Sequence, residues 1–180
     1  MYVSLETPER GMARQPNVEL VGANAKEIQL GAATMETKVR MDRPVTQRIA
    51  RSLNAGAGAE AVSAQPDRVF LNLEGISGTK DSAVFYVYVN LPAGADPGAH
   101  PEKRAGAVSL FGVSKASGAD DPHGGNGLNE VLEITRIVDD MHLAGSLDAS
   151  DLNIRFVPRG ADRNLDGISI RRVSVYRQGH

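Results

Sequence analysis

The chain has 180 residues, a formal net charge of −2 and no cysteine. Without cysteine it can form neither disulfides nor thiolate metal sites, and its near-neutral charge gives no general attraction to nucleic acid or to an anionic membrane surface. No stretch approaches the roughly 18 apolar residues of a transmembrane helix, and the charged beginning MYVSLETPER lacks the apolar core of a signal peptide. We therefore expect neither a nucleic-acid nor a membrane partner. These features do not indicate the cellular compartment of the protein.

Turn-forming residues separate many short apolar runs. The chain contains 19 glycines and 9 prolines, and aromatic residues make up 4%. This pattern favours an all-β domain. Residues 1–16 carry charge and proline without hydrophobic periodicity, which is typical of a linker or arm. We expect residues 17–180 to form a single β-sandwich domain, because a chain of this length can bury a core.

The first part of this domain is predicted to contain strands and one helix. Residues 17–22 and 26–30 are predicted to pair as two short strands. Polar and apolar residues alternate over 35–41, which indicates a half-buried strand. A surface helix is predicted over 44–54, where apolar residues recur every four positions and Asp42 can cap the first turn.

The middle of the chain is predicted to alternate strands with loops. Residues 69–75 and 107–112 are predicted strands. The inward residues of the first of these are Val69, Leu71 and Leu73. Residues 83–90 are apolar on both faces, so we expect a central strand or one whose outer side is covered by something else. Loops are predicted over 92–101 and 114–127, and a loop as long as the second is uncommon unless it binds or covers something, or is disordered.

The last part of the chain combines one helix with the closing strands. A strand over 130–134 is followed by apolar residues at helical spacing, and this helix is predicted to end before Gly145. A strand that begins at Leu152 is predicted to stop at Pro158. The final strand changes the parity of its apolar residues, which predicts a bulge at 171–172. About seven short strands with one or two short helices predict an antiparallel, jelly-roll-like β-sandwich.

One short motif is typical of calcium sites. Asp162, Asn164 and Asp166 belong to a D-x-N-x-D-G sequence, the opening of an EF-hand loop. The twelfth position of such a loop should be a bidentate glutamate, and here it is Val173. The three residues are therefore weak metal candidates, and a polar turn before the last strand is the better interpretation.

The four histidines are isolated from one another. His100, His123, His142 and His180 form neither H-x-x-x-H nor H-E-x-x-H, so no helix face offers a local pair of metal ligands. Spacing alone leaves a Ser/His/Asp triad open, because triads assemble in space, although no G-x-S-x-G sequence is present. A small enzyme that uses a triad or a bound metal is one of the hypotheses to test.

Several segments together resemble a known domain. They are ELVGAN (19–24), RVFLNLEGISG (68–78), VFYVYVN (84–90), LEITRIVDDMHLAG (132–145) and LNIRFVPRG (152–160). In this order and spacing they resemble the C-terminal β-sandwich, or shielding, domain of bacterial and plant tyrosinases and polyphenol oxidases. The resemblance covers about 160 residues, and the copper-binding helices of full-length family members are missing from it.

The resemblance implies that this chain is not the catalyst. The type-3 copper centre of that family takes six histidine ligands, more than the four histidines present here. The resemblance therefore implies no copper and no other cofactor in this chain. Its partner would be a helical di-copper domain that oxidises phenols and diphenols.

Shielding domains of this family cover the active-site entrance, keep the enzyme latent and assist copper loading or folding. One side chain often enters the substrate pocket as a plug. The aromatic candidates for a plug or partner contact are Tyr86, Tyr88 and Phe111, although each lies in a predicted strand where core packing is the alternative. No plug residue can be transferred by motif.

A different class of function stays open beside this one. The chain could be a free-standing β-sandwich module that binds a protein or carbohydrate through the loops at 92–106 and 114–127. The scarcity of aromatic residues argues against carbohydrate. A surface without an exposed apolar patch would favour the module over the shielding domain.

Overall fold

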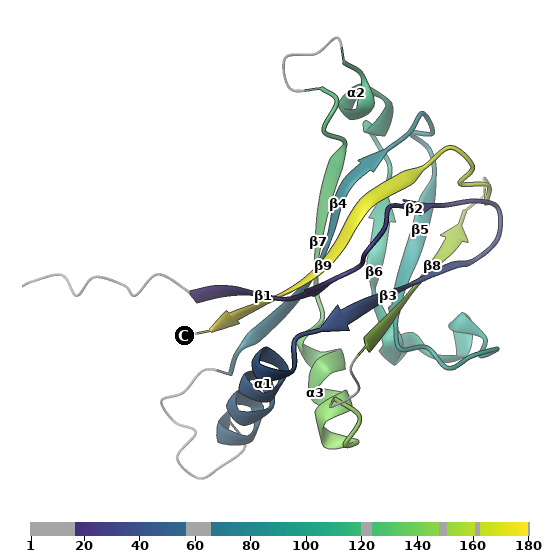
Figure 1. Ribbon diagram of the computed structural model, residues 1–180. Coiled ribbons are helices and arrows are strands. Elements are labelled where there is room, and N and C mark those ends of the chain that lie inside the picture. The colour runs from purple at the N-terminus through teal and green to yellow at the C-terminus, as the bar shows by residue number, and fades with distance from the viewer. Residues whose placement is uncertain (1–16, 57–65, 120–123, 148–150, 161–162, 180) are drawn as a thin grey trace, which may run out of the picture.

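The computed structural model describes residues 17–56, 66–119, 124–147, 151–160 and 163–179. Nine strands in these ranges form one antiparallel sheet with the order β6-β5-β8-β3-β1-β9-β4-β7, and β2 pairs with β9 beside that path (Figure 1). The strands are β1 (Asn17–Ala23), β2 (Ile28–Gln29), β3 (Met35–Met41), β4 (Arg68–Ser77), β5 (Val84–Val89), β6 (Arg104–Ser109), β7 (Leu128–Glu133), β8 (Asp151–Arg159) and β9 (Ser169–Gly179). The predicted all-β antiparallel class is confirmed, with more strands than the seven or so expected.

The two ends of the sheet come together. A Cβ atom placed on Gly106 of β6 would lie 2.8 Å from Cδ2 of Leu132 on β7. The side chain of Leu132 therefore lies against the backbone of β6, where glycine leaves room for it. No ladder between β6 and β7 is present among the described strands. The sheet is therefore a nearly closed barrel that encloses one core.

The inner face of the sheet carries the core. The three residues predicted to point inward from β4 are all fully buried, and they are Val69, Leu71 and Leu73. Phe85 of β5 and Phe156 of β8 meet edge to face, with ring centroids 5.9 Å apart. This geometry is favourable for aromatic pairs, and it stabilises the core beyond the burial of the two rings.

Helices close the two ends of the barrel. α1 (Arg43–Gly56) and α3 (Thr135–Leu143) lie at one end, and α2 (Val113–Ser117) lies at the other (Figure 1). The helix predicted at 44–54 is confirmed, and Asp42 Oδ1 accepts a hydrogen bond from the backbone N–H of Val45 at 3.2 Å. No helix in the described ranges is long and apolar enough to cross a membrane.

One predicted strand pairing and some predicted strand ends are wrong. The strands at 17–22 and 26–30 do not pair with each other, because both pair with β9. The strand predicted at 107–112 begins at Arg104 and ends at Ser109. β8 does not stop at Pro158 but continues through it. Proline is tolerated there because the ladder of β8 with β3 has already ended at Phe156.

The bulge predicted at 171–172 is absent from the pairing of β9 with β4, whose register is continuous there. The buried residues of β9 do change from one parity to the other, as the sequence indicates, since Ile170 and Val173 are both buried. β4 changes faces at the same level, at Gly75, where φ is +64°. Glycine adopts this left-handed conformation without steric cost. The irregularity of register lies on the other side of β4, in its ladder with β7.

Candidate partner-binding surface

Tyr88 lies under residues 91–103 of its own chain, which we call the covering segment. Its side chain is 3% exposed on the outer face of β5. The buried Arg155 of β8, opposite Tyr88 in the ladder, donates to the carbonyl oxygens of Leu91 at 3.4 Å and Pro92 at 3.2 Å. Arg155 also pairs with Glu36 of β3. At Tyr88, the chain itself thus supplies the outer cover that the sequence of β5 led us to expect.

Tyr86 is half-buried between two cations. The guanidinium carbons of Arg104 and Arg159 each lie 4.9 Å from the centre of its ring. Cations favour the face of an aromatic ring because the ring quadrupole attracts them. The ring is thereby held between β6 and β8 rather than free to move.

Phe111 lies in a turn and not in a strand. β6 ends two residues before it, and its side chain is 85% exposed. Both Leu110 and Val113 are fully buried beside it. The turn is closed by a hydrogen bond from the N–H of Val113 to the carbonyl of Leu110 at 2.9 Å. This turn therefore presents an aromatic ring to solvent on a backbone that is fixed from both sides.

The turn at Phe111 is also fixed from the β4–β5 connection. The carboxylate of Asp81 accepts hydrogen bonds from the hydroxyl of Ser114 and from its backbone N–H, the latter at 2.9 Å. These bonds lower the pKa of Asp81 below its usual value, with the hydroxyl of Ser114 as the main cause. A carboxylate at this position replaces the missing side-chain cap of α2, because the N-cap residue is Gly112.

A second exposed region lies on the outer side of β1, β9, β4 and β7. We call it the outer apolar face, and its residues are Val18, Leu20, Phe70, Val131 and Tyr176. Leu20, Tyr176 and Phe70 are neighbours in one cross-strand row. A shallow hollow of about 400 Å³ lies over this face. Sequence reasoning missed it because the row appears only once four strands are placed in register.

The outer apolar face is bordered by an ion pair. Arg68 donates to both carboxylate oxygens of Glu133, one at 3.1 Å and one at 2.5 Å, and its guanidinium lies 5.1 Å from the ring centre of Phe70. The hydrogen bond from Arg68 is the main reason that the pKa of Glu133 is lowered, and Thr135 adds a second bond. Arg68 and Glu133 therefore hold each other in a defined arrangement at the edge of the outer apolar face.

Two of the three weak metal candidates, Asn164 and Asp166, lie in a turn. The side-chain oxygen of Asn164 accepts the N–H of Asp166 at 2.8 Å, and the N–H of Ile168 bonds to the carbonyl of Leu165 at 3.0 Å. Asp162 lies outside the described residues. Within the part of the chain that the structure describes, no three His, Asp or Glu side chains gather to hold a metal ion.

Comparison with known proteins identifies relatives of the domain. A family model described as a domain of unknown function, DUF7868, matches residues 17–178. The tyrosinase HcTyr1 of Hahella sp. (strain CCB-MM4) is 22% identical over 174 residues, which are 97% of this chain and 35% of that protein. The chain thus spans about a third of the length of this relative.

Solved structures show the same fold. The latent aurone synthase (polyphenol oxidase) from natural source matches 84% of this chain with a TM-score of 0.54 and 13% identity. The recombinantly expressed latent aurone synthase matches 86% with a TM-score of 0.52 and 14% identity. In both cases 26% of the solved chain is covered, and the matched part is its C-terminal part. The resemblance to the C-terminal domain of tyrosinases and polyphenol oxidases is confirmed.

Proposed function

The chain belongs to the family of DUF7868 domains, and we propose that it is the non-catalytic C-terminal domain of a tyrosinase or polyphenol oxidase, where it covers the active-site entrance. The partner would be a helical catalytic domain with a type-3 copper centre that oxidises phenols and diphenols. The similarity to a tyrosinase and to two structures of a polyphenol oxidase named as latent, aurone synthase, supports this proposal.

The exposed ring of Phe111 is the observation that carries the proposal. A group that blocks a phenol site must imitate a phenol, so it must be aromatic or apolar, protrude and be held rigidly. Phe111 meets these conditions, since it lies 85% exposed in a turn between two buried residues. We propose Phe111 as the side chain that enters the substrate pocket.

The other two aromatic candidates are placed less favourably. Tyr88 is buried beneath the chain's own segment, so it reaches a partner only if that segment leaves. Tyr86 is half-buried and lies between Arg104 and Arg159. We therefore propose no plug role for either of them.

The outer apolar face offers a wider contact with the catalytic domain. α2, which follows Phe111, meets the end of β4, where Ser117 accepts a hydrogen bond from the N–H of Gly78 at 2.9 Å, whereas Phe70 lies near the start of the same strand. Exposed apolar patches on soluble domains mark interaction surfaces. The presence of the outer apolar face also favours the shielding domain over a free-standing module. We propose that the face is a second contact with the catalytic domain, at a distance from the Phe111 turn.

An inhibition assay tests the proposal. The chain is added to a separately produced, copper-loaded catalytic domain of the parent tyrosinase, and oxidation of a diphenol is followed. We expect inhibition that Phe111→Ala weakens by at least roughly tenfold, because removal of a buried aromatic contact at an interface costs about 2 kcal/mol or more.

Phe111→Tyr and Leu143→Ala serve as controls. The first keeps an aromatic ring and should retain inhibition. The second removes another strongly exposed apolar side chain, on α3 at the other end of the barrel, and should leave inhibition unchanged. Absence of both association and inhibition with the unchanged chain would contradict the proposal. We also propose that the domain aids copper loading, and comparing the copper content of the catalytic domain produced with and without this chain tests this.

A further inference from the structure

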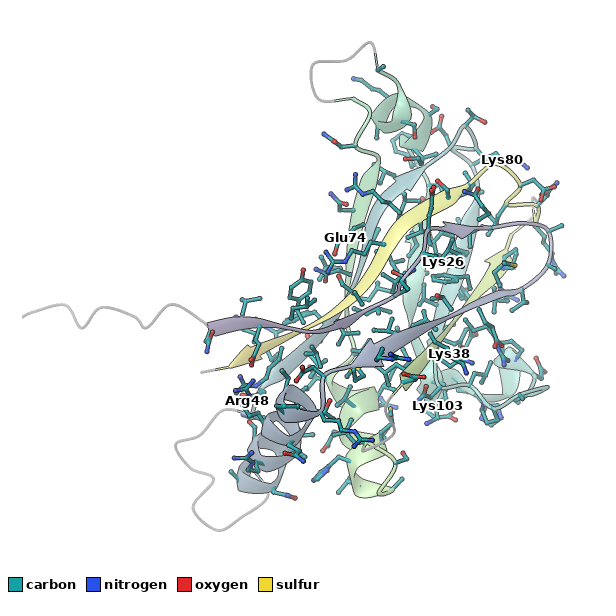
Figure 2. All side chains as sticks on the ribbon, viewed as in Figure 1. Lys26, Lys38, Arg48, Glu74, Lys80 and Lys103 are labelled. Atoms are coloured by element: carbon teal, nitrogen blue, oxygen red, sulfur yellow. The ribbon has the colours of Figure 1, made fainter. Side chains whose placement is uncertain are left out.

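A small pocket lies between β5, β6, β8 and the segment that covers them. Its volume is about 270 Å³, which is near the lower limit for small-molecule sites. Lys103, at the end of the covering segment, marks the neighbourhood of the pocket in Figure 2. The lining residues are Tyr86, Tyr88, Asp96, Pro97, Gly98, Pro101, Arg104, Val157 and Arg159.

The pocket carries two cations without a carboxylate partner. Among the described residues, no carboxylate oxygen lies within 4.0 Å of the guanidinium of Arg104 or of Arg159. Both guanidinium carbons lie 4.9 Å from the ring centre of Tyr86, so they are at most twice that distance apart. Their N–H groups are available to a ligand that carries an oxyanion.

The acidic residue of the pocket is already engaged. Asp96 Oδ1 accepts a hydrogen bond from the N–H of Gly98 at 3.0 Å, and this bond closes a turn in the covering segment. Asp96 therefore shapes the pocket, and its single charge offsets only part of the charge of the two arginines. The net charge of the lining side chains is positive, which favours an anionic ligand.

The walls of the pocket are held in place before any ligand arrives. Arg155 fixes the covering segment through the carbonyls of Leu91 and Pro92. Tyr86 lies on β5, which is paired on both sides with β6 and β8. A site that needs little rearrangement loses less free energy on binding.

We propose that this pocket binds a small aromatic carboxylate. The positive charge of the two arginines would attract the carboxylate, and the apolar side chains of Pro97, Pro101 and Val157 would contact the ring of the ligand. The pocket volume suits one aromatic ring and not a larger molecule. This site is independent of the proposed plug, because Phe111 does not line it.

Benzoate titration tests the proposal. The probe is sodium benzoate, and the signals followed are the side-chain Nε–H resonances of arginine in the isotope-labelled chain. We expect saturable shifts of the resonances of Arg104 and Arg159, with a dissociation constant of about 1 mM or below. No catalytic domain is needed, so failure here and failure of the inhibition assay are distinguishable.

Four variants separate the site from general charge effects. Arg104→Gln and Arg159→Gln should each weaken benzoate binding, and the double variant should weaken it by roughly tenfold or more, because each removes charge-assisted hydrogen bonds. Arg136→Gln, at an exposed position of α3, is the matched control and should bind as the unchanged chain does. Circular dichroism confirms that all four variants are folded.

A comparison of three ligands tests which chemical class the pocket binds. Benzamide has the shape of benzoate without its charge, and it should not bind. Inorganic phosphate has charge without a ring, and it should bind at least tenfold more weakly than benzoate. Equal binding of phosphate and benzoate, equal binding of benzamide and benzoate, or absence of any saturable shift would each overturn the proposal.

Discussion

Arg155 is the side chain whose loss should be felt most widely. It lies in β8, is 7% exposed, pairs with Glu36 and donates to the carbonyls of Leu91 and Pro92. One side chain thus connects β3 to the segment that buries Tyr88. A guanidinium is suited to this role because its donors are spread in a fixed plane.

We expect Arg155→Met to lower the free energy of unfolding by about 1–3 kcal/mol, because it leaves carbonyl oxygens without their donor. Urea unfolding followed by circular dichroism measures this. Arg40→Gln is the control, since Arg40 lies 4.0 Å from Asp151 and is 88% exposed, and surface ion pairs of this kind contribute little. Equal effects of the two substitutions would show that Arg155 does not have the role assigned to it.

Glu133 should give part of the stability a dependence on pH. Arg68 and Thr135 lower its pKa below the ordinary value of 4.5. In the acidic range the unfolded chain therefore binds more protons than the folded one, so stability increases with pH there. The contribution is present above about pH 4.5 and is lost as the pH falls through the lowered pKa of the folded state.

We expect Glu133→Gln to reduce the slope of stability against pH below about pH 4.5, the ordinary value of the group, and to leave the slope near pH 7 unchanged. Urea unfolding at a series of pH values measures both slopes. Glu130→Gln is the control, because Glu130 lies on the same strand. A slope that Glu133→Gln leaves unchanged would contradict this assignment.

Among the elements, the turn before α2 depends on a glycine in the left-handed conformation. Gly112 has a φ of +82°, and a Cβ atom there would have nothing within 4 Å. Gly112→Ala therefore isolates the cost of the left-handed conformation, and we expect a loss of about 1 kcal/mol in the free energy of unfolding. Gly118→Ala is the control, because Gly118 ends α2 with an ordinary φ of −71°. A loss at Gly118 as large as at Gly112 would rule out backbone conformation as the cause.

The elements also show what sequence patterns can predict. Strand 69–75 was predictable because one parity of residues is apolar, and the helix at 44–54 because its apolar residues recur every four positions. Phe111 was placed in a strand because it follows an apolar run. The backbone turns there for reasons that lie elsewhere in the sequence, namely the carboxylate of Asp81 and the left-handed Gly112. Contacts between distant residues of this kind leave no local signal.

The candidate surfaces differ in the same way. Tyr86, Tyr88 and Phe111 could be named as aromatic residues, but their exposure depends on the covering segment and on where β6 ends. The outer apolar face requires the register of four strands. The pairing of β1 with β9 joins residues far apart in the chain, and such pairings depend on tertiary packing rather than on local propensity.

At the scale of the whole molecule, the two ends of the barrel and its outer side offer distinct surfaces. α1 and α3 close one end, and Arg48 of α1 pairs with Glu19 of β1 near that end (Figure 2). At the other end Lys80 donates to the carbonyl of Asn164 at 2.8 Å (Figure 2). The exposed apolar residues of the outer face lie along the side between them, so a partner seated there would not need to displace either closing layer.

The outer apolar face should therefore tolerate a charge in the free domain but not in the complex. Val131 is 60% exposed on β7, so Val131→Glu should change the free energy of unfolding by about 0.5 kcal/mol or less. In the complex the same carboxylate would be buried without a partner, and we expect binding to the copper-loaded catalytic domain to weaken by roughly 30-fold or more. Leu143→Glu places the same charge at the α3 end, where Leu143 is 77% exposed, and should leave binding unchanged. Surface plasmon resonance with the immobilised catalytic domain measures both variants. Equal weakening by the two would indicate a general charge effect, and full binding by Val131→Glu would place the docking surface elsewhere on the barrel.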